Sequence, residues 1–200
     1  MAYFIVCALS LFLYLVIKTY EDKKWWNDYS KSPYNFRFKH KGKTMWYSRS
    51  CAVACFVFCK NRLGQWHVLA NQRGFGCPNY QFYWNCCCGF LDMNETIEQA
   101  CIRECQEETG IKLKLSDLNF YGINSTPKGN QNITIRYYAE LDGCTIEQLP
   151  PMITNQGEKD EVNAVAWIPI KDVNNEKYLW AFGHKNIIRE IYNNIIAKAT

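Results

Sequence analysis

Three glutamates, Glu104, Glu107 and Glu108, lie within five residues of one another. At about 100° per residue, the rotation of an α-helix, they fall within one arc roughly 100° wide. The same side carries an apolar stripe one and two turns earlier, formed by Ile97, Ala100 and Cys101. A solvated charge face therefore fits less well than carboxylates half-turned toward a core, which need cations to compensate them. Oxygen ligands of this kind suit hard divalent ions, magnesium above all.

The residues around this cluster predict a helix over residues 97–109. Thr96 followed by Gln99 fits a capping box at its start. Gly110 supplies the left-handed residue that ends the helix. Gly89 ends a strand-like run before the connecting loop, where a bare backbone lets a carbonyl approach a ligand. The elements needed to position the carboxylates are thus a strand, a loop and a capped helix.

At this point the segment resembles the signature of a known family. Gly89, Glu95 and the run at 103–111, RECQEETGI, match every defining position of the Nudix box. Cys88 and Asn94 stand where that box commonly has glycine, and neither departure removes a carboxylate. The resemblance implies an α/β fold, the Nudix-type α/β/α sandwich with a mixed β-sheet, which agrees with the pattern of strands and helices.

The resemblance also implies an activity and a set of site residues. Nudix hydrolases cleave the pyrophosphate bond of a nucleoside diphosphate linked to another group, assisted by Mg²⁺ or Mn²⁺. Cations held by carboxylates can bridge phosphate oxygens and acidify the attacking water. The implied metal ligands in this chain are Glu104, Glu107, Glu108 and the backbone carbonyl of Gly89. Glu95 is implied to support the site, and Arg103, four residues before Glu107, to orient the helix carboxylates.

The general base is left open by the resemblance, because the family draws it either from the box or from a later loop. Glu158, Asp160 and Glu161 lie just before an expected strand at 161–170, where such a loop acid would come. A polar loop without a catalytic role is an equal alternative for these three acids. Of the three, Glu161 is the candidate base.

Substrate choice rests on fewer residues. Pro127 lies sixteen residues beyond Ile111, a spacing that resembles the ADP-ribose pyrophosphatase branch of the family. The segment 180–188 resembles an Ala-Phe-Asp-His sequence found in several ADP-ribose-type members, with glycine in place of the aspartate. His184 in this segment either lines a pocket or, as we favour, caps the last helix. Arg73, at the end of a strand, either reaches a substrate phosphate or forms a surface ion pair.

An unbroken apolar run occupies residues 2–17. It is slightly shorter than the ~20 residues that span a bilayer, and flanking lysine and aromatic side chains extend its usable length. No Lys or Arg precedes it and no small-residue cleavage site follows it, which disfavours a signal peptide. An amphipathic soluble helix is disfavoured because the run has no polar face. We expect a single-pass anchor at residues 1–20 with the catalytic domain in the cytoplasm, since the positive charges follow the run.

Residues 21–45 carry mixed charge with a basic excess. They are expected to form a juxtamembrane linker and an edge hairpin that turns at Gly42. A nucleic-acid-binding arm is the alternative, helped by nearby aromatic residues. The net charge of +4 does not by itself favour nucleic acid, so we regard that partner as disfavoured.

The chain has 11 cysteines, an odd number whose spacing does not form a disulfide framework. This usage fits a reducing compartment. Most of the cysteines are expected to be small buried hydrophobes. A structural zinc site is left open, although three consecutive cysteines at 86–88 do not offer paired C-x-x-C ligands.

Residues 46–200 are expected to form one domain. Strand-like runs lie at 51–59, 66–73, 82–90, 117–123, 133–141 and 161–170. Isoleucines at helical spacing between 187 and 196 indicate a final helix. Strands before and between two substantial helices predict a mixed sheet that is covered on both faces.

The leading functional hypothesis is a metal-dependent pyrophosphohydrolase acting on ADP-ribose or a related nucleoside diphosphate sugar at the cytoplasmic membrane face. One alternative is a nucleotide-sensing domain that binds without hydrolysis, which the intact set of acids disfavours. Another is removal of nucleotides from RNA 5′ ends, using the basic segment near residues 37–49. The oligomeric state is left open, with a homodimer among the options.

Overall fold

The structure is a computed structural model of the 200-residue chain. It describes residues 36–126, 132–149 and 160–199. The expected anchor at residues 1–20, Pro127 and Glu158 all lie outside the described residues. Within the described ranges, none of the helices has both the length and the apolar character needed to cross a bilayer. The chain divides into two compact units, residues 1–49 and 50–200.

The first unit contains an antiparallel hairpin of β1 (Phe36–His40) and β2 (Lys43–Tyr47). Lys41 and Gly42 connect the strands and have φ values of 47° and 76°. A two-residue type I′ turn requires positive φ at both central positions, and glycine adopts it without strain. The structure therefore confirms a hairpin that turns at Gly42.

The second unit is built on a seven-stranded sheet with β3 (Cys51–Lys60) at its centre. β3 pairs antiparallel with β4 (Trp66–Arg73) and β6 (Cys87–Phe90), and parallel with β8 (Ile133–Thr145). The outer strands are β5 (Trp84–Asn85) and β9 (Val162–Pro169), which pair with β4, and β7 (Leu118–Asn124), which pairs with β8. One parallel pair among antiparallel pairs makes the sheet mixed, as the sequence predicts.

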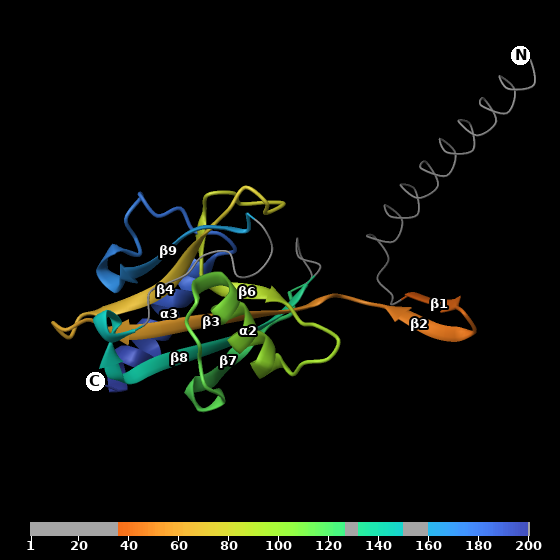
Figure 1. The fold of residues 1–200 in the computed structure, drawn as a ribbon, viewed down its shortest axis with the longest axis horizontal. Coiled ribbons are helices and arrows are strands. Elements are labelled where there is room, and N and C mark those ends of the chain that lie inside the picture. The colour runs from red at the N-terminus through yellow and green to blue at the C-terminus, as the bar shows by residue number, and fades with distance from the viewer. Residues whose placement is uncertain (1–35, 127–131, 150–159, 200) are drawn as a thin grey trace, which may run out of the picture. The chain divides into compact units, whose positions relative to one another are not determined.

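Two helices cover opposite faces of this sheet, α2 (Ile97–Thr109) and α3 (His184–Ile191) (Figure 1). Successive residues of β3 point alternately to the two faces. Val53, Cys55 and Val57 join the core beneath α2, whereas Ala54, Phe56 and Phe58 join the core beneath α3. The remaining helical elements are η1 (Leu115–Asp117), η2 (Ile146–Gln148), η3 (Ile170–Asp172), the π-helical η4 (Tyr192–Ile196) and α4 (Ala197–Ala199). The expected sandwich, with helices on both sides of the sheet, is confirmed.

The ten described cysteines all carry free thiols. Cys55 lies in hydrogen-bonding contact with Cys101, and Cys87 with Cys105, between the sheet and α2. These contacts and burial raise the pKa of Cys55 and of Cys87 well above the ordinary thiol value. The thiols are therefore protonated at neutral pH. The interpretation of these cysteines as small buried hydrophobes is confirmed.

His184, the first residue of α3, packs against the sheet near Cys86. Its Nδ1 accepts a hydrogen bond from the Cys86 N–H at 3.0 Å, and its ring meets Phe56 edge to face at 5.2 Å between centroids. Gly183 occupies the N-cap position of α3, with no side-chain cap bond. The expectation that His184 caps the helix is wrong, because its ring is buried against the sheet and engaged there.

The buried imidazole predicts a loss of stability in mild acid. Burial lowers the pKa of His184 from its ordinary 6.5 to about 3. Between these values the unfolded chain binds a proton that the folded chain does not, so stability present above pH 6.5 is lost as the pH falls. One such group costs about 1.4 kcal/mol per pH unit in that window.

Urea unfolding at several pH values between 7 and 4 tests this expectation. His184→Asn is the matched variant, because an amide oxygen can still accept the Cys86 N–H bond without titrating. The free energy of unfolding should fall more steeply with acidification in the native chain than in this variant. Parallel pH dependences would show that His184 does not contribute.

Candidate active site

Helix α2 begins and ends where the sequence predicts. The Thr96 Oγ1 accepts a hydrogen bond from the Gln99 N–H at 3.2 Å, and the Thr96 N–H donates to the Gln99 Oε1 at 2.8 Å. Gly110 adopts φ 77° and its N–H donates to the Gln106 carbonyl at 2.8 Å. These reciprocal bonds satisfy end groups that the helix leaves unpaired. They fix the register that places Glu104 and Glu108 one turn apart.

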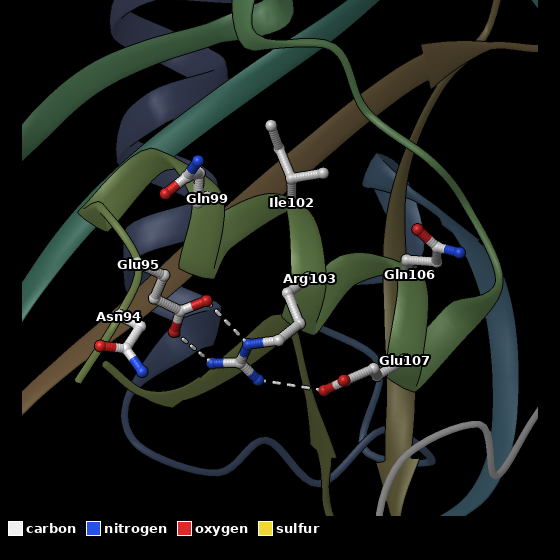
Figure 2. Close-up of a pocket in the computed structure, with 7 residues that line it drawn as sticks. All are labelled: Asn94, Glu95, Gln99, Ile102, Arg103, Gln106 and Glu107. Atoms are coloured by element: carbon white, nitrogen blue, oxygen red, sulfur yellow. Dashed lines mark hydrogen bonds and ion pairs between the residues drawn. The ribbon is translucent and has the colours of Figure 1, made fainter. Parts of the chain in front are cut away.

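Arg103 is the centre of an ionic network on α2 (Figure 2). Its Nη2 and Nε donate to the two carboxylate oxygens of Glu95 at 2.7 and 2.9 Å. Its Nη1 donates to Glu104 at 2.7 Å and to Glu107 at 3.0 Å. A fifth bond reaches the Phe90 carbonyl at 3.0 Å. Arg103 therefore holds three carboxylates at once, with a bidentate grip on Glu95 that lowers the pKa of that carboxyl group.

Glu104 lies against β6 at a point where only glycine fits. A Cβ added to Gly89 would overlap the Glu104 carboxylate. The Glu104 side chain is only 13% exposed. Burial raises the pKa of its carboxyl group against the lowering effect of Arg103. The close approach explains why glycine occupies position 89 of β6.

Gly89→Ala is expected to displace the Glu104 carboxylate and weaken metal binding more than folding. The collision is with the end of a flexible side chain, so the backbone need not move. Changes that misorient a ligand typically cost about 10–100-fold in metal affinity. The metal concentration for half-maximal activity should rise by that order. Gly122→Ala in β7 is the control, because a Cβ there meets nothing within 4 Å; equal metal dependence in both variants would contradict the expectation.

Glu108 reaches the sheet. Its Oε2 accepts hydrogen bonds from the Asn71 Nδ2 at 2.9 Å and from the Cys88 N–H at 3.0 Å. Burial raises the pKa of Glu108 well above its ordinary value, and the charge of Glu104 adds to the increase. Sequence reasoning missed Asn71. The signal available in the sequence was an amide within an apolar strand. In the structure the Asn71 side chain is buried, with Asn71 only 1% exposed.

Glu161 interacts electrostatically with the box glutamates although it is distant from them in sequence. Its charge contributes to the raised pKa of Glu104 and of Glu108, after burial as the main cause. Its carbonyl accepts a bond from the Gly74 N–H at 2.5 Å. Asp160, the neighbouring acid, is exposed, has φ 64° and accepts a bond through its carbonyl from Gly76 at 2.9 Å. Of the two described loop acids, Glu161 is the one whose charge affects the pKa of Glu104 and of Glu108, as is expected of a base near these carboxylates.

The donor set fits a hard divalent cation. In residues 36–126, 132–149 and 160–199, no three His, Cys, Asp or Glu side chains converge to ligate an ion as they stand. The carboxylates do not converge because Arg103 binds Glu104 and Glu107, while Glu108 accepts hydrogen bonds from the sheet. The carboxylates nevertheless share one side of α2 and are all oxygen donors, as Mg²⁺ and Mn²⁺ prefer. Burial is the main cause of the raised pKa of Glu104 and of Glu108, and the charges of neighbouring carboxylates add to it.

Arg73 at the end of β4 is held by neutral partners. Its Nε donates to the Asn79 carbonyl at 3.1 Å, and its Cζ lies 4.9 Å from the ring centre of Phe182. Among the described residues it makes no salt bridge, so the surface ion pair considered from sequence is not found there.

A surface cavity of ≈ 640 Å³ lies along the outer side of α2. Figure 2 shows the residues that line it: Asn94, Glu95, Gln99, Ile102, Arg103, Gln106 and Glu107. Arg103 and Glu107 therefore border both this cavity and the acidic cluster. Glu104 and Glu108 are not part of its lining and face the sheet instead.

Comparison with known proteins identifies the family. The model of the NUDIX domain matches residues 49–191, which is most of the chain. The chain belongs to the Nudix family. A search of curated proteins gave no significant match.

Solved Nudix structures share the fold. A MutT/nudix family protein from Enterococcus faecalis has a TM-score of 0.60 and 21% identity, covering 88% of this chain and 69% of that protein. The NUDIX domain of Shewanella oneidensis NrtR, complexed with ADP ribose, has a TM-score of 0.58 and 21% identity over 79% and 94% of the two chains. A bifunctional NMN adenylyltransferase/ADP ribose pyrophosphatase from Francisella tularensis, complexed with AMP and a Mn ion, has a TM-score of 0.58 and 21% identity over 90% and 48%.

The Nudix segment brings together most of the residues singled out from sequence. One bonded network contains Glu95, Arg103, Glu104 and Glu107. Gly89 lies against Glu104, and Glu108 lies on the same side of α2. The charge of Glu161 adds to the raised pKa of Glu108. Arg73 is not part of this network and lies over the ring of Phe182.

Proposed function

We propose that this Nudix protein is a divalent-metal-dependent pyrophosphohydrolase that cleaves ADP-ribose or a related nucleoside diphosphate sugar. The observation that carries the proposal is the intact, half-buried carboxylate set on one side of α2, with Glu104 and Glu107 held by Arg103 and Glu108 bonded to the sheet. A domain that only bound nucleotides would not need every one of these acids. Two similar structures contain ligands of this class, ADP ribose in one and AMP with a Mn ion in the other, which supports this class of substrate.

Each residue has a role in the proposal. Glu104, Glu107 and Glu108 hold the cation together with the Gly89 carbonyl. Mg²⁺ or Mn²⁺ held there would neutralise the diphosphate oxygens and acidify the attacking water. Glu95 fixes Arg103, and Arg103 orients Glu104 and Glu107. Arg73 contacts a substrate phosphate.

Glu161 is the proposed general base. It accepts a proton from water as the water oxygen attacks phosphorus, and the bridging P–O bond breaks to leave a phosphate on each product. The charge of Glu161 adds to the raised pKa of Glu104 and of Glu108, which supports this role. Pro127, by its spacing from the box, is proposed to contribute to substrate binding.

A substrate panel tests the function. The full chain is incubated with ADP-ribose, other nucleoside diphosphate sugars and 5′-triphosphorylated RNA, each with Mg²⁺ and with Mn²⁺, and the products are resolved by chromatography. The expected result is AMP and ribose 5-phosphate from ADP-ribose, with no release in excess chelator. Turnover confined to RNA ends, or no turnover of any substrate, would contradict the proposal.

We also propose that residues 1–20 anchor the protein to a membrane, with the Nudix domain on the cytoplasmic side. The proposal rests on the apolar run at 2–17 and the positive charges that follow it. A tagged chain lacking residues 1–20 should move from the membrane fraction to the soluble fraction. An unchanged distribution would rule out the anchor.

A further inference from the structure

Four aromatic side chains are exposed on two loops at one end of the second unit. They are Phe75, Tyr80, Phe82 and Phe182, which are 75%, 46%, 52% and 42% exposed. Three lie in the loop after β4 and the fourth in the loop before α3 (Figure 1). Tyr80 and Phe182 meet edge to face at 5.0 Å between ring centroids. We call these four residues the aromatic cluster.

The cluster is held in place by backbone bonds between the loops. The Trp84 N–H donates to the Leu179 carbonyl at 2.7 Å, and the Ala181 N–H donates to the Trp84 carbonyl at 2.8 Å. The Phe82 N–H donates to the Arg73 carbonyl at 2.8 Å. These bonds fix the backbone of the loops that carry the rings. Loops fixed in this way lose little conformational freedom when a flat ligand stacks on their rings, which favours binding.

The backbone conformation of the cluster is unusual. Tyr80, Phe82 and Phe182 have φ values of 51°, 64° and 54°. Bulky side chains rarely adopt this left-handed region, because it costs free energy. Packing of the rings into a core does not explain the cost, since all three are exposed. Such positions gather at ligand-binding sites, where a side chain must point in a set direction.

The cluster borders the acidic site. Arg73 ends β4 two residues after Asn71, the residue whose side chain bonds Glu108. The loop that follows Arg73 is tied to the acidic loop, because the Gly74 N–H and the Cys77 thiol both donate to the Glu161 carbonyl. A ligand on the cluster would therefore extend toward the carboxylates past Arg73.

Arg73 gives the cluster its charge. Its guanidinium lies over Phe182, while its Nε and Nη2 bond Asn79. A nucleobase can stack on aromatic and arginine planes. In a nucleotide the phosphate lies one ribose away from the base, where it could meet the guanidinium beside the rings.

We propose that the aromatic cluster binds the nucleobase of the nucleotide substrate, with Arg73 on the adjacent phosphate. This inference rests on the proposed function and adds to it the subsite that selects a nucleoside over a base-free sugar phosphate. A lipid surface or a protein partner would use the rings but would not need a cation placed between them and a carboxylate site.

Binding of AMP and of ribose 5-phosphate to the full chain tests the subsite by calorimetry, without any need for turnover. Phe182→Leu and Tyr80→Leu keep apolar volume but remove the stacking plane. AMP affinity should fall about tenfold in each, given the loss typical of one base–aromatic contact. Ribose 5-phosphate affinity should not change. Phe182→Tyr should retain AMP affinity.

Phe120→Leu in β7 is the matched control, because Phe120 is an exposed phenylalanine outside the cluster, at 58%. It should bind AMP as the native chain does. Unchanged AMP affinity in both cluster variants, or an equal loss for ribose 5-phosphate, would overturn the inference. Hydrolysis of ADP-ribose by the native chain together with that result would leave the proposed function standing, so the two failures are distinguishable.

Discussion

Glu107→Gln is expected to reduce hydrolysis of ADP-ribose by about a thousandfold, equivalent to about 4 kcal/mol of transition-state stabilisation. Glu107 is the most exposed of the three α2 carboxylates, with 37% of its side chain accessible, and Arg103 is its bonded partner. An amide of the same shape keeps a hydrogen-bond acceptor but loses the negative charge that a cation needs. The rate constants are measured at saturating Mg²⁺ with the native chain in parallel.

Glu98→Gln is the matched control for that change. Glu98 lies in the first turn of the same helix, where its carboxylate accepts a bond from the Tyr137 hydroxyl at 2.7 Å. Its activity should match that of the native chain. Thermal unfolding of both variants checks that neither has lost its fold. Full activity in Glu107→Gln would refute the proposed metal site.

Arg103→Ala is expected to lower the free energy of unfolding by about 2 kcal/mol, because it leaves three carboxylates without their shared partner. Arg103 is 27% exposed, so water offsets part of the cost. For a unit of this size, that change lowers the melting temperature by roughly 4–8 °C. Mg²⁺ should recover part of the loss, since a cation can compensate the carboxylates that Arg103 leaves.

Arg103→Lys separates charge from geometry. Lysine keeps the positive charge but cannot make the bidentate contact with Glu95 or span to Glu104 and Glu107 together. Its stability should fall between those of the native chain and Arg103→Ala. A double-mutant cycle with Glu95→Gln should give a coupling energy near 1 kcal/mol or above. Native stability in Arg103→Ala would show that the network contributes nothing to folding.

Local signals in the sequence were enough to predict the helix and the sheet. The capping box at Thr96 and the left-handed Gly110 fixed the bounds of α2, because both act within one turn. Alternating and continuous apolar runs located β3, β4 and β8, and the final isoleucines located α3. These features depend on residues close in sequence.

Features that depend on distant residues could not be predicted in the same way. The bond between Asn71 and Glu108 joins residues 37 positions apart, and the amide in an apolar strand that marks Asn71 does not identify its partner. The role assigned to His184 as a cap was wrong because its partner, Cys86, lies 98 residues away. The aromatic cluster likewise forms from two loops that only the folded sheet brings together.

The contacts of Arg103 could be predicted only in part from the periodicity of the helix. Its spacing predicted a contact with Glu107, four residues later, and that contact is present. The stronger, bidentate contact is with Glu95, in the loop before the helix. Loop geometry decided this pairing, and helical periodicity does not describe loops.

Binding of Mn²⁺ to the full chain, followed by the loss of the free-ion paramagnetic resonance signal, tests the metal site most directly. The expected result is saturable binding by the native chain that is lost in the triple variant Glu104→Gln, Glu107→Gln, Glu108→Gln and kept in Glu98→Gln. Equal Mn²⁺ binding by the native chain and the triple variant would contradict the assignment of these carboxylates as the metal site.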